Sequence, residues 1–355
     1  MLCVVGTRPN FMKTMPVVAE LEARADQFEP VLVHTGQHYD ANMSEVFLRE
    51  LGGFTPKHML GVGSGTHSEQ TARVMERLEP ILAREQPDVV LVPGDVNSTL
   101  AAALASAQLG LRVGHVEAGL RNFDRTMPEE LNRVLTDQIS ELLFTHSPEA
   151  RENLLAEGRP DSAIHFVGNT MIDTLTAVRE RLEAVDPLSR GLDPGEYLVV
   201  TLHRPSLVDG PLLAEAVAEL EALSERLVIF FPVHPRTRAR LERLGLDPKA
   251  ERFRLVDPIG YTEFLGLVGA SAGVLTDSGG IQEETTYLGV PCFTLRSTTE
   301  RPITVSEGTN VLLGLAPERI AEIPALLDSR PHRSEPPALW DGHAAARLVD
   351  VLAHE

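Results

Sequence analysis

The sequence has few of the features that mark secreted, membrane-bound or nucleic-acid-binding proteins. Its two cysteines, Cys3 and Cys292, stand far apart in 355 residues, so neither a disulfide framework nor a zinc site is expected. No apolar run approaches the roughly 18–20 residues that cross a bilayer, and the chain opens directly into an apolar segment without a basic leader. The formal net charge of −19 repels polyanions. We therefore expect a cytoplasmic protein with no nucleic-acid and no membrane partner.

The sequence does contain a regular alternation of strand-like and helix-like segments, which is typical of parallel α/β sheets. Strands are predicted at 2–5, 31–34, 89–92, 113–116 and 142–145, and again at 198–202, 228–231, 253–256, 274–276 and 292–295. A turn-rich stretch at 186–195 marks a linker between the two series. The length also favours two domains. We predict Rossmann-like domains at 1–167 and 168–340, with a last helix at about 341–355 that can pack back on the first domain.

Polar residues follow several of the predicted strands, at the edge where such sheets bind ligands. The loop after the first strand carries Arg8 and Lys13, which can contribute charge to a phosphate site. It lacks the G-x-G-x-x-G dinucleotide pattern, and a tight turn with solvated side chains is the alternative. Asp95 and Glu117 end two successive strands, which would place two carboxylates in one crevice. A helix cap or a structural ion pair is the alternative for each.

A helix is predicted to begin at Pro128, with Glu129 and Arg133 four residues apart on one face. Spacing alone favours an exposed ion pair between these two side chains. In the second half, His203 and His234 end two strands beside arginines. They either cap loops or contact phosphate or sugar groups.

The segment 276–284 gives the strongest phosphate signal. A strand breaks at Ser278, Gly279 and Gly280 before a helix begins. This arrangement aims backbone amides and the positive end of a helix dipole at an anion. Ser278 can donate a hydroxyl bond, and Glu284 can accept bonds from ribose hydroxyls. An ordinary glycine-rich turn is the alternative.

Taken in order, these segments resemble the UDP-N-acetylglucosamine 2-epimerase family of the non-hydrolysing kind, whose members share the two-domain GT-B fold of many glycosyltransferases. The resemblance runs over nearly the whole chain. The ordered set of motifs that carries it is Gly6–Pro9, Thr35–His38, Gly94–Asp95, His115–Arg121, Pro128–Arg133, Gly168–Thr170, His203–Arg204, Pro232–His234, Thr276–Glu284 and Thr298–Pro302.

The resemblance implies that the chain interconverts UDP-N-acetylglucosamine and UDP-N-acetylmannosamine without an external cofactor or a metal. UDP leaves C1 while a base removes the C2 proton, and UDP adds back to the resulting 2-acetamidoglucal as a proton arrives on the other face. The implied catalytic residues are Asp95, Glu117, Glu129, Arg133 and His203. The implied UDP contacts are Arg8, Lys13, His234, Ser278, Gly279, Gly280 and Glu284. A homodimer is common for this fold.

Two departures from the family pattern concern regulation and the first loop. Many bacterial members read His-Arg-Arg-Glu where this chain has His203-Arg204-Pro205-Ser206. In those members the stretch helps to hold a second, activating UDP-N-acetylglucosamine together with a Gln-His loop. Gln37 and His38 remain and, with Arg73, are the candidates for a weaker second site. Asn10 stands where glutamate is commoner. We expect the activation to be lost.

Several other functions are compatible with the same motifs. A hydrolysing 2-epimerase would release N-acetylmannosamine and UDP. A 2-epimerase of a diacetamido or related UDP-sugar is possible because no motif indicates which substituents the sugar carries at C3 or C6. A GT-B glycosyltransferase is disfavoured by the three carboxylates, and a catalytically dead UDP-sugar sensor predicts a broken carboxylate set, whereas this set is intact. The motifs leave open which carboxylate acts on which face of C2.

Overall fold

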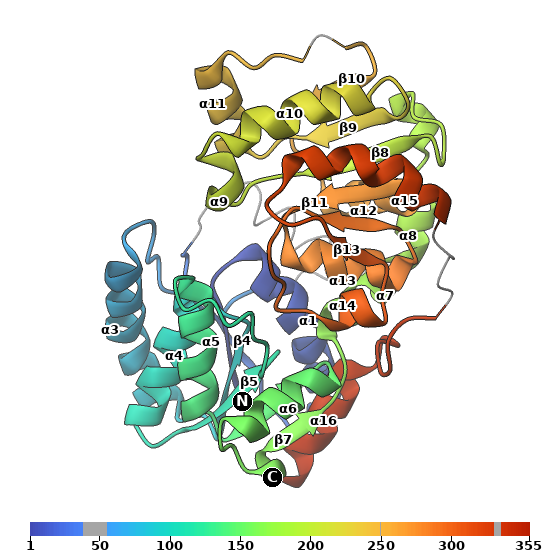
Figure 1. Cartoon of the computed structure of the whole chain (residues 1–355). Coiled ribbons are helices and arrows are strands. Elements are labelled where there is room, and N and C mark those ends of the chain that lie inside the picture. Colours follow the sequence, from blue (N-terminus) through green and yellow to red (C-terminus); the bar gives the residue numbers. More distant parts are fainter. Residues whose placement is uncertain (38–54, 249, 330–334) are drawn as a thin grey trace. The chain divides into compact units, whose positions relative to one another are not determined.

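The computed structural model describes residues 1–37, 55–248, 250–329 and 335–355. The chain divides into two compact units, residues 1–177 with 338–355, and residues 178–337 (Figure 1). The boundary between the units lies between residues 177 and 178, whereas the sequence predicted it between residues 167 and 168. The reason is that α7 (Thr170–Ala177) packs on α1 (Arg8–Ala23) within the first unit. The turn-rich stretch 186–195 lies inside the second unit, where Leu192 is fully buried.

The first unit contains a seven-stranded parallel sheet in the order β3-β2-β1-β4-β5-β6-β7. The central strands are buried apolar runs, as expected for a parallel sheet covered on both faces. The strands are β1 (Leu2–Val5), β2 (Val31–His34), β3 (His58–Met59), β4 (Val89–Pro93), β5 (Arg112–Val116), β6 (Leu142–Thr145) and β7 (Ile164–Phe166).

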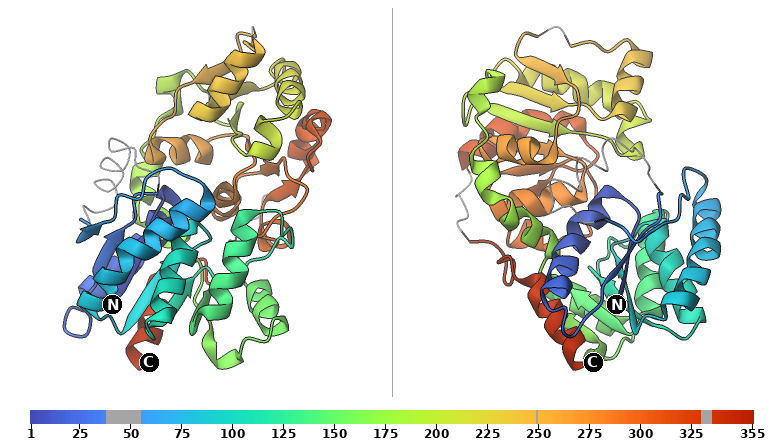
Figure 2. Two further views of the ribbon diagram at one scale, coloured as in Figure 1. Left: turned by 90° about the vertical axis from the view of Figure 1, so that its left-hand side faces the viewer. Right: turned by 180° about the vertical axis from the view of Figure 1, so that it is seen from behind.

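Helices cover both faces of this sheet. α3 (His67–Glu85), α4 (Asn97–Gln108) and α5 (Pro128–Ile139) lie side by side in chain order. α1 packs against α7 and against the last helix, α16 (Ala344–His354), as the view from behind shows (Figure 2). α6 (Pro148–Ala156) contacts β6 and β7, and a short 3₁₀ turn, η1 (Asp161–Ala163), leads into β7. The core on the α3 and α4 side is aliphatic, with Val4, Val33, Leu78 and Val90 among its members.

The second unit contains a six-stranded parallel sheet in the order β10-β9-β8-β11-β12-β13. Alternate residues of β8 enter different cores: Leu198 and Val200 join one cluster, and Tyr197 and Val199 join another. This is the two-residue period of a strand that is buried on both faces. The strands are β8 (Tyr197–Thr201), β9 (Val228–Pro232), β10 (Phe253–Val256), β11 (Gly273–Thr276), β12 (Cys292–Thr294) and β13 (Asn310–Leu312).

Two helices of the second unit supply most of the apolar cover. α10 (Leu212–Leu223) joins one core, and α12 (Tyr261–Gly269) joins the other. The remaining helical elements are α8 (Arg179–Glu183), η2 (Pro187–Arg190), α9 (Pro205–Val208), α11 (Pro235–Leu244), α13 (Gly279–Leu288), α14 (Ile303–Ser306), η3 (Pro317–Glu322) and α15 (Ile323–Ser329).

The predicted fold class, α/β of GT-B type with two Rossmann-like parallel sheets, is confirmed. Every predicted strand is present, with ends that shift by about one residue at most. Three short strands, β3, β7 and β13, were not predicted, and each lies at an outer edge of its sheet. The two cysteines lie on β1 and β12 as buried thiols. Burial raises the pKa of the Cys3 thiol to about 12.

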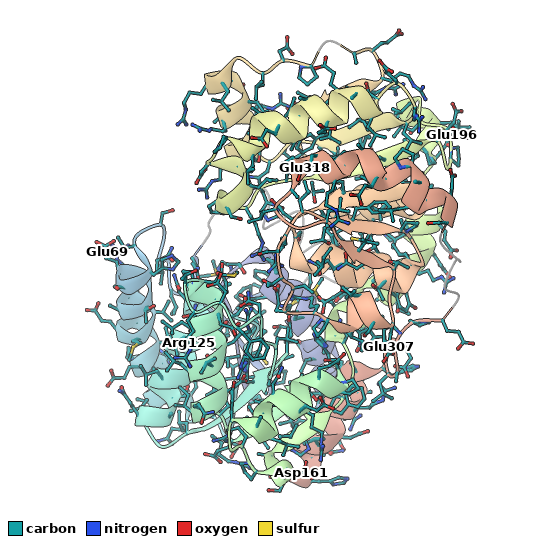
Figure 3. All side chains as sticks on the ribbon, in the orientation of Figure 1. Glu69, Arg125, Asp161, Glu196, Glu307 and Glu318 are labelled. Atoms are coloured by element: carbon teal, nitrogen blue, oxygen red, sulfur yellow. The ribbon has the colours of Figure 1, made fainter. Side chains whose placement is uncertain are left out.

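Carboxylates are prominent on the surface of each unit. Glu69 and Asp161 of the first unit, and Glu196 and Glu318 of the second, are exposed and extend outward (Figure 3). This surface carries part of the net negative charge noted from the sequence. No helix among residues 1–37, 55–248, 250–329 and 335–355 is long and apolar enough to cross a membrane.

Candidate active site

Two carboxylates follow neighbouring strands of the first sheet. β4 and β5 pair in parallel with Pro93 opposite Val116, and the amide of Gly94 donates to the carbonyl of Val116 at 2.9 Å. Asp95 and Glu117 come directly after these paired ends. The structure therefore brings the two residues to one edge of the sheet, at the carboxyl ends of β4 and β5.

Glu117 adopts a backbone conformation that is rare for residues other than glycine. Its φ is +71°, a left-handed value that costs on the order of 1–3 kcal/mol. The residue is only 8% exposed, and its carboxylate forms an ion pair with the ammonium group of Lys13, which is 5% exposed and comes from α1. Buried charges require such a partner. Local strain of this kind concentrates at functional sites.

Arg133 of α5 joins two carboxylates. It is 2% exposed, and one end of its guanidinium bonds to Asp95. Its Nη2 and Nε bond to Glu130 at 2.6 and 3.2 Å. Glu130 also accepts the backbone amides of Asn122 and Phe123 at 3.2 and 2.9 Å. Arg133 therefore orients Asp95, while Glu130 ties the loop before α5 to the helix.

Glu129 lies beside this network without joining it. Within the part of the chain whose side chains are described, no hydrogen bond or ion pair reaches its carboxylate. The exposed Glu129–Arg133 pair expected from the four-residue spacing does not form, because Arg133 turns to Glu130 and Asp95 instead. The half-buried carboxylate of Glu129 stands at the start of α5, at the same sheet edge.

The polar side of α5 faces inward, and its leucines face outward. Leu131 and Leu135 are 43% and 44% exposed. The face toward the sheet carries the polar residues that organise the site. An amphipathic pattern would instead have placed the leucines on that face. The buried residues of α5 are Glu130, Asn132, Arg133, Thr136 and Asp137.

In the second unit, the two predicted histidines lie at neighbouring strand ends. His203 follows β8 and His234 follows β9, and their ring centroids are 5.7 Å apart. Asp277, after β11, is 1% exposed and accepts the amides of His203 and Arg204 at 2.9 and 2.8 Å. One of its oxygens lies 3.2 Å from His203 Nδ1. Asp277 therefore fixes the loop and orients the imidazole of His203.

His234 caps α11 through its ring. Nδ1 accepts the amide of Arg236 at 3.2 Å, so the neutral ring carries its proton on Nε2. Partial burial, together with the neighbouring His203 and Arg236, lowers the pKa of His234. The ring is therefore neutral at pH 7 and offers Nε2–H as a donor.

The glycine-rich segment starts α13 as expected from the sequence. Gly279 is the first residue of the helix and Gly280 the second, and the first amides of a helix lack intrahelical acceptors. The hydroxyl of Ser278 does not cap the helix. A Cβ at Gly279 would lie 2.5 Å from Arg301 Nη1 and 2.7 Å from Glu300 Oε1. Only glycine fits this close approach.

A buried cluster of charges surrounds this helix start. Arg301 contacts Glu300 and lies 2.9 Å from Glu283, while Arg296 lies 2.6 Å and Arg204 3.8 Å from Glu300. Burial raises the pKa of the Glu300 carboxyl, but Arg301 and Arg296 outweigh it and hold that pKa well below its usual range. The free backbone amides at the start of the helix suit an anion.

Glu284, predicted to contact a ribose, already has a protein partner. It is 3% exposed, and one carboxylate oxygen accepts the hydroxyl of Tyr261 at 2.8 Å. This bond orients the carboxylate from α12. A ribose contact by Glu284 stays a prediction.

The residues predicted for a regulatory site make structural contacts in the first unit. Gln37 is 5% exposed and accepts both the amide and the hydroxyl of Ser98 at 3.2 and 2.7 Å. Arg73 donates to the carbonyls of Val62 and Ser64 at 3.3 and 3.1 Å. His38 and the side chain of Arg8 lie outside the described residues.

Sequence reasoning missed several residues that hold the site in place. The polar stripe on α5 was the available signal for Glu130 and Asp137, since positions three, four and seven apart share a helical face. Asp277, Glu283 and Arg301 belong to quoted motifs but received no role, because nothing in their spacing predicts a buried ion-pair cluster.

The fold and these groups define a two-unit α/β protein with a candidate ligand-binding edge in each unit. Each unit presents charged side chains at the carboxyl edge of a parallel sheet, and the second unit adds a glycine-rich helix start. Ligands of open α/β sheets bind at such edges.

Comparison with known proteins identifies the family. The model of the family described as UDP-N-acetylglucosamine 2-epimerase matches residues 19–353. A UDP-N-acetylglucosamine 2-epimerase of Methanococcus maripaludis is 42% identical, with 99% of this chain and 98% of the relative covered. A UDP-2,3-diacetamido-2,3-dideoxy-D-glucuronate 2-epimerase of Pseudomonas aeruginosa is 39% identical, with 99% of both covered.

A solved structure agrees with these sequence matches. The Methanocaldococcus jannaschii UDP-GlcNAc 2-epimerase, in complex with UDP-GlcNAc and UDP, superposes with a TM-score of 0.92 at 39% identity. The superposition covers 100% of this chain and 99% of that one. The chain belongs to the UDP-N-acetylglucosamine 2-epimerase family, an isomerase family.

Proposed function

We propose that the chain interconverts UDP-N-acetylglucosamine and UDP-N-acetylmannosamine by eliminating UDP and adding it back. The observation that carries the proposal is the pair of carboxylates at one sheet edge, Asp95 held by Arg133 and Glu117 held by Lys13. Glu129, next to Glu130 in the first turn of α5, is the third proposed carboxylate. Inversion at C2 needs acid–base groups on both faces of the sugar ring, and several carboxylates supply them. Family membership supports the choice of substrate.

In the proposed reaction, one carboxylate takes the proton from C2 while the C1–O bond breaks and its electron pair leaves with UDP. A C1–C2 double bond forms, giving the 2-acetamidoglucal. A carboxylic acid on the opposite face then returns a proton to C2 as the diphosphate oxygen re-forms the bond at C1. Atoms and charge balance without any oxidant, in keeping with the expectation that no external cofactor takes part.

The second unit is proposed to bind and stabilise the departing diphosphate. His203, oriented by Asp277, and His234, a donor through Nε2, are suitable for phosphate oxygens. The amides of Gly279 and Gly280 suit the same group. Preorganised donors of this kind stabilise developing charge in a transition state. Arg8, Lys13 and Ser278 are the remaining proposed UDP contacts, and Glu284 is assigned to the ribose.

The test is an incubation in D₂O with UDP-N-acetylglucosamine as the only added compound, followed by NMR. We expect UDP-N-acetylmannosamine with deuterium at C2. Free N-acetylmannosamine with UDP would indicate the hydrolysing reaction instead. Epimerisation without solvent label would reject the elimination. Asp95→Asn, Glu117→Gln and Glu129→Gln should each lower turnover by about 10²–10⁴-fold.

A second candidate substrate is a UDP-2,3-diacetamido sugar. The Pseudomonas aeruginosa relative that carries this activity in its name is nearly as similar as the N-acetylglucosamine enzymes. Comparing kcat/KM for the two UDP-sugars under identical conditions decides between them. A preference of about tenfold or more, equivalent to about 1.4 kcal/mol, assigns the substrate.

We also propose that the enzyme is a homodimer and that α5 lies in the interface. Leu131 and Leu135 are one turn apart on its outer face and 43% and 44% exposed, and exposed apolar surface marks interaction sites. Light scattering should give twice the mass of one chain. Leu131→Glu with Leu135→Glu should give monomers, while Leu188→Glu, at a site 59% exposed, should leave the dimer intact.

The cytoplasm is the proposed compartment. Both cysteines are buried thiols, and thiols persist in reducing surroundings. The net charge of −19 supports the absence of a nucleic-acid partner. Cell fractionation followed by immunoblotting tests the location, and recovery in the membrane fraction would contradict it.

A further inference from the structure

A buried histidine and a buried aspartate connect the loops that follow β4 and β5. His115 of β5 and Asp137 of α5 are both 0% exposed. His115 Nδ1 lies 2.6 Å from Asp137 Oδ1, and Nε2 lies 2.7 Å from the carbonyl oxygen of Gly94. The other oxygen of Asp137 accepts the amide of Gly119 at 3.1 Å. One carboxylate therefore reaches both loops, directly or through a single imidazole ring.

The hydrogen-bond partners determine the protonation of the His115 ring. The carbonyl of Gly94 can only accept. Burial raises the pKa of Asp137, but His115 and Arg121, whose Nη2 lies 2.7 Å from Asp137 Oδ2, outweigh that effect and hold the pKa below its usual value. The Nε2–H of His115 therefore donates to the carbonyl of Gly94, and Nδ1 pairs with the carboxylate of Asp137, so both ring nitrogens have fixed partners.

We propose that His115 is a positioning residue for Asp95 and that Asp137 orients His115. The carbonyl of Gly94 belongs to the peptide group that leads into Asp95, so a bond to that oxygen fixes the plane from which the Asp95 side chain projects. The inference rests on the proposed catalytic role of Asp95. His115 touches no substrate in this scheme and acts only through the backbone.

The neighbouring bonds restrain other parts of the same residue. Arg133 holds the carboxylate of Asp95, and Asn132 donates to its carbonyl at 2.9 Å. Among the described side chains, His115 is the one that bonds the carbonyl of the preceding peptide. Losing this bond frees the peptide to rotate, and a shift of about 1 Å in a catalytic group can cost about 10²-fold in rate.

Two substitutions of His115 separate its two bonds. In His115→Gln, the amide nitrogen takes the approximate place of Nε2 and keeps the bond to Gly94. In His115→Asn, the amide nitrogen takes the approximate place of Nδ1, so the bond to Asp137 is kept and the bond to the carbonyl of Gly94 is lost. We expect His115→Asn to lower kcat by about 10²-fold with little change in KM, and His115→Gln to retain most of kcat.

Glu157→Gln is the matched control. It neutralises the carboxylate of Glu157, which lies 2.6 Å from Arg121, and leaves both bonds of His115 in place, so kcat should be unchanged. Equal losses of kcat in His115→Asn and His115→Gln, or no loss in either, would overturn the proposal. A wild-type protein that does not epimerise any UDP-sugar would instead reject the proposed function.

The ring assignment has a separate readout that does not depend on activity. ¹⁵N NMR of the wild-type protein, with the His115→Gln spectrum identifying the signals, should show a protonated Nε2 for His115. An unprotonated Nε2 would overturn the assignment. The same measurement decides the question if His115→Asn does not fold.

Discussion

Two adjacent glutamates on α5 should respond to the same substitution in opposite ways. Glu130 is 2% exposed and accepts Arg133 and two backbone amides. Glu129 is half-buried and has no partner within the described part of the chain. We predict that Glu130→Gln destabilises the first unit and that Glu129→Gln does not. Both changes remove one charge from one helix and keep the side-chain shape, so each is the control for the other.

The loss of stability expected for Glu130→Gln follows from the hydrogen bonds that a glutamine amide cannot accept. The carboxylate of Glu130 uses both oxygens as acceptors, whereas a glutamine must turn an NH₂ group toward one set of donors. Removing one member of a buried ion pair costs about 3–5 kcal/mol. The lower end, about 3 kcal/mol, applies here because Arg133 keeps its ion pair with Asp95. For a domain of this size each kcal/mol shifts Tm by about 2–4 °C, giving a fall of about 6–12 °C.

The single tryptophan makes the assay specific for the first unit. Trp340 is 0% exposed, and its Nε1 donates to the carbonyl of His146 at 2.9 Å. Residue 340 belongs to the first unit, so its fluorescence reports the unfolding of that unit. Glu129→Gln should stay within about 0.5 kcal/mol of wild type. Equal Tm values for the two variants, or a larger fall for Glu129→Gln, would refute the reasoning.

Three further predictions concern other parts of the molecule. The pKa of Glu300 is depressed in the folded protein, so this carboxylate stabilises the fold fully above its unfolded-state pKa of about 4.3, and the stabilisation is lost as the pH falls through its folded-state pKa. In denaturant titrations, the difference in unfolding free energy between wild type and Glu300→Gln should therefore narrow below about pH 4.3. Gly119→Ala should lower Tm far more than Gly158→Ala, because φ is positive at both but only at Gly119 would the new Cβ lie 2.3 Å from a backbone oxygen; equal losses in thermal melts would contradict this. Because Pro205 and Ser206 replace the residues tied to activation, velocity against UDP-N-acetylglucosamine should be hyperbolic and the reverse reaction should start from UDP-N-acetylmannosamine alone; a sigmoidal curve would argue for a retained second site.

The local sequence determined which segments form the central strands and where the polar loops begin. The runs at 2–5 and 142–145 coincide with β1 and β6, which are buried throughout, because a strand buried on both faces is a largely apolar run. The glycine-rich start of α13 was also visible, since few other residues allow such a close backbone approach. The ordered motifs sufficed to indicate the family.

Only the tertiary structure decided the edge strands and the partners of the charged side chains. β3 and β13 are too short for a pattern and exist because a neighbouring strand offers backbone bonds. The choice of Glu130 over Glu129 as the partner of Arg133 depends on which side of α5 meets the sheet. The sequence of α5 alone does not orient it, because an amphipathic pattern assigns Leu131 and Leu135 to the core, whereas the fold leaves both exposed. Burial of charge is a property of the assembled fold, and the buried side chains of Arg133 and Lys13 hold Asp95 and Glu117 in place.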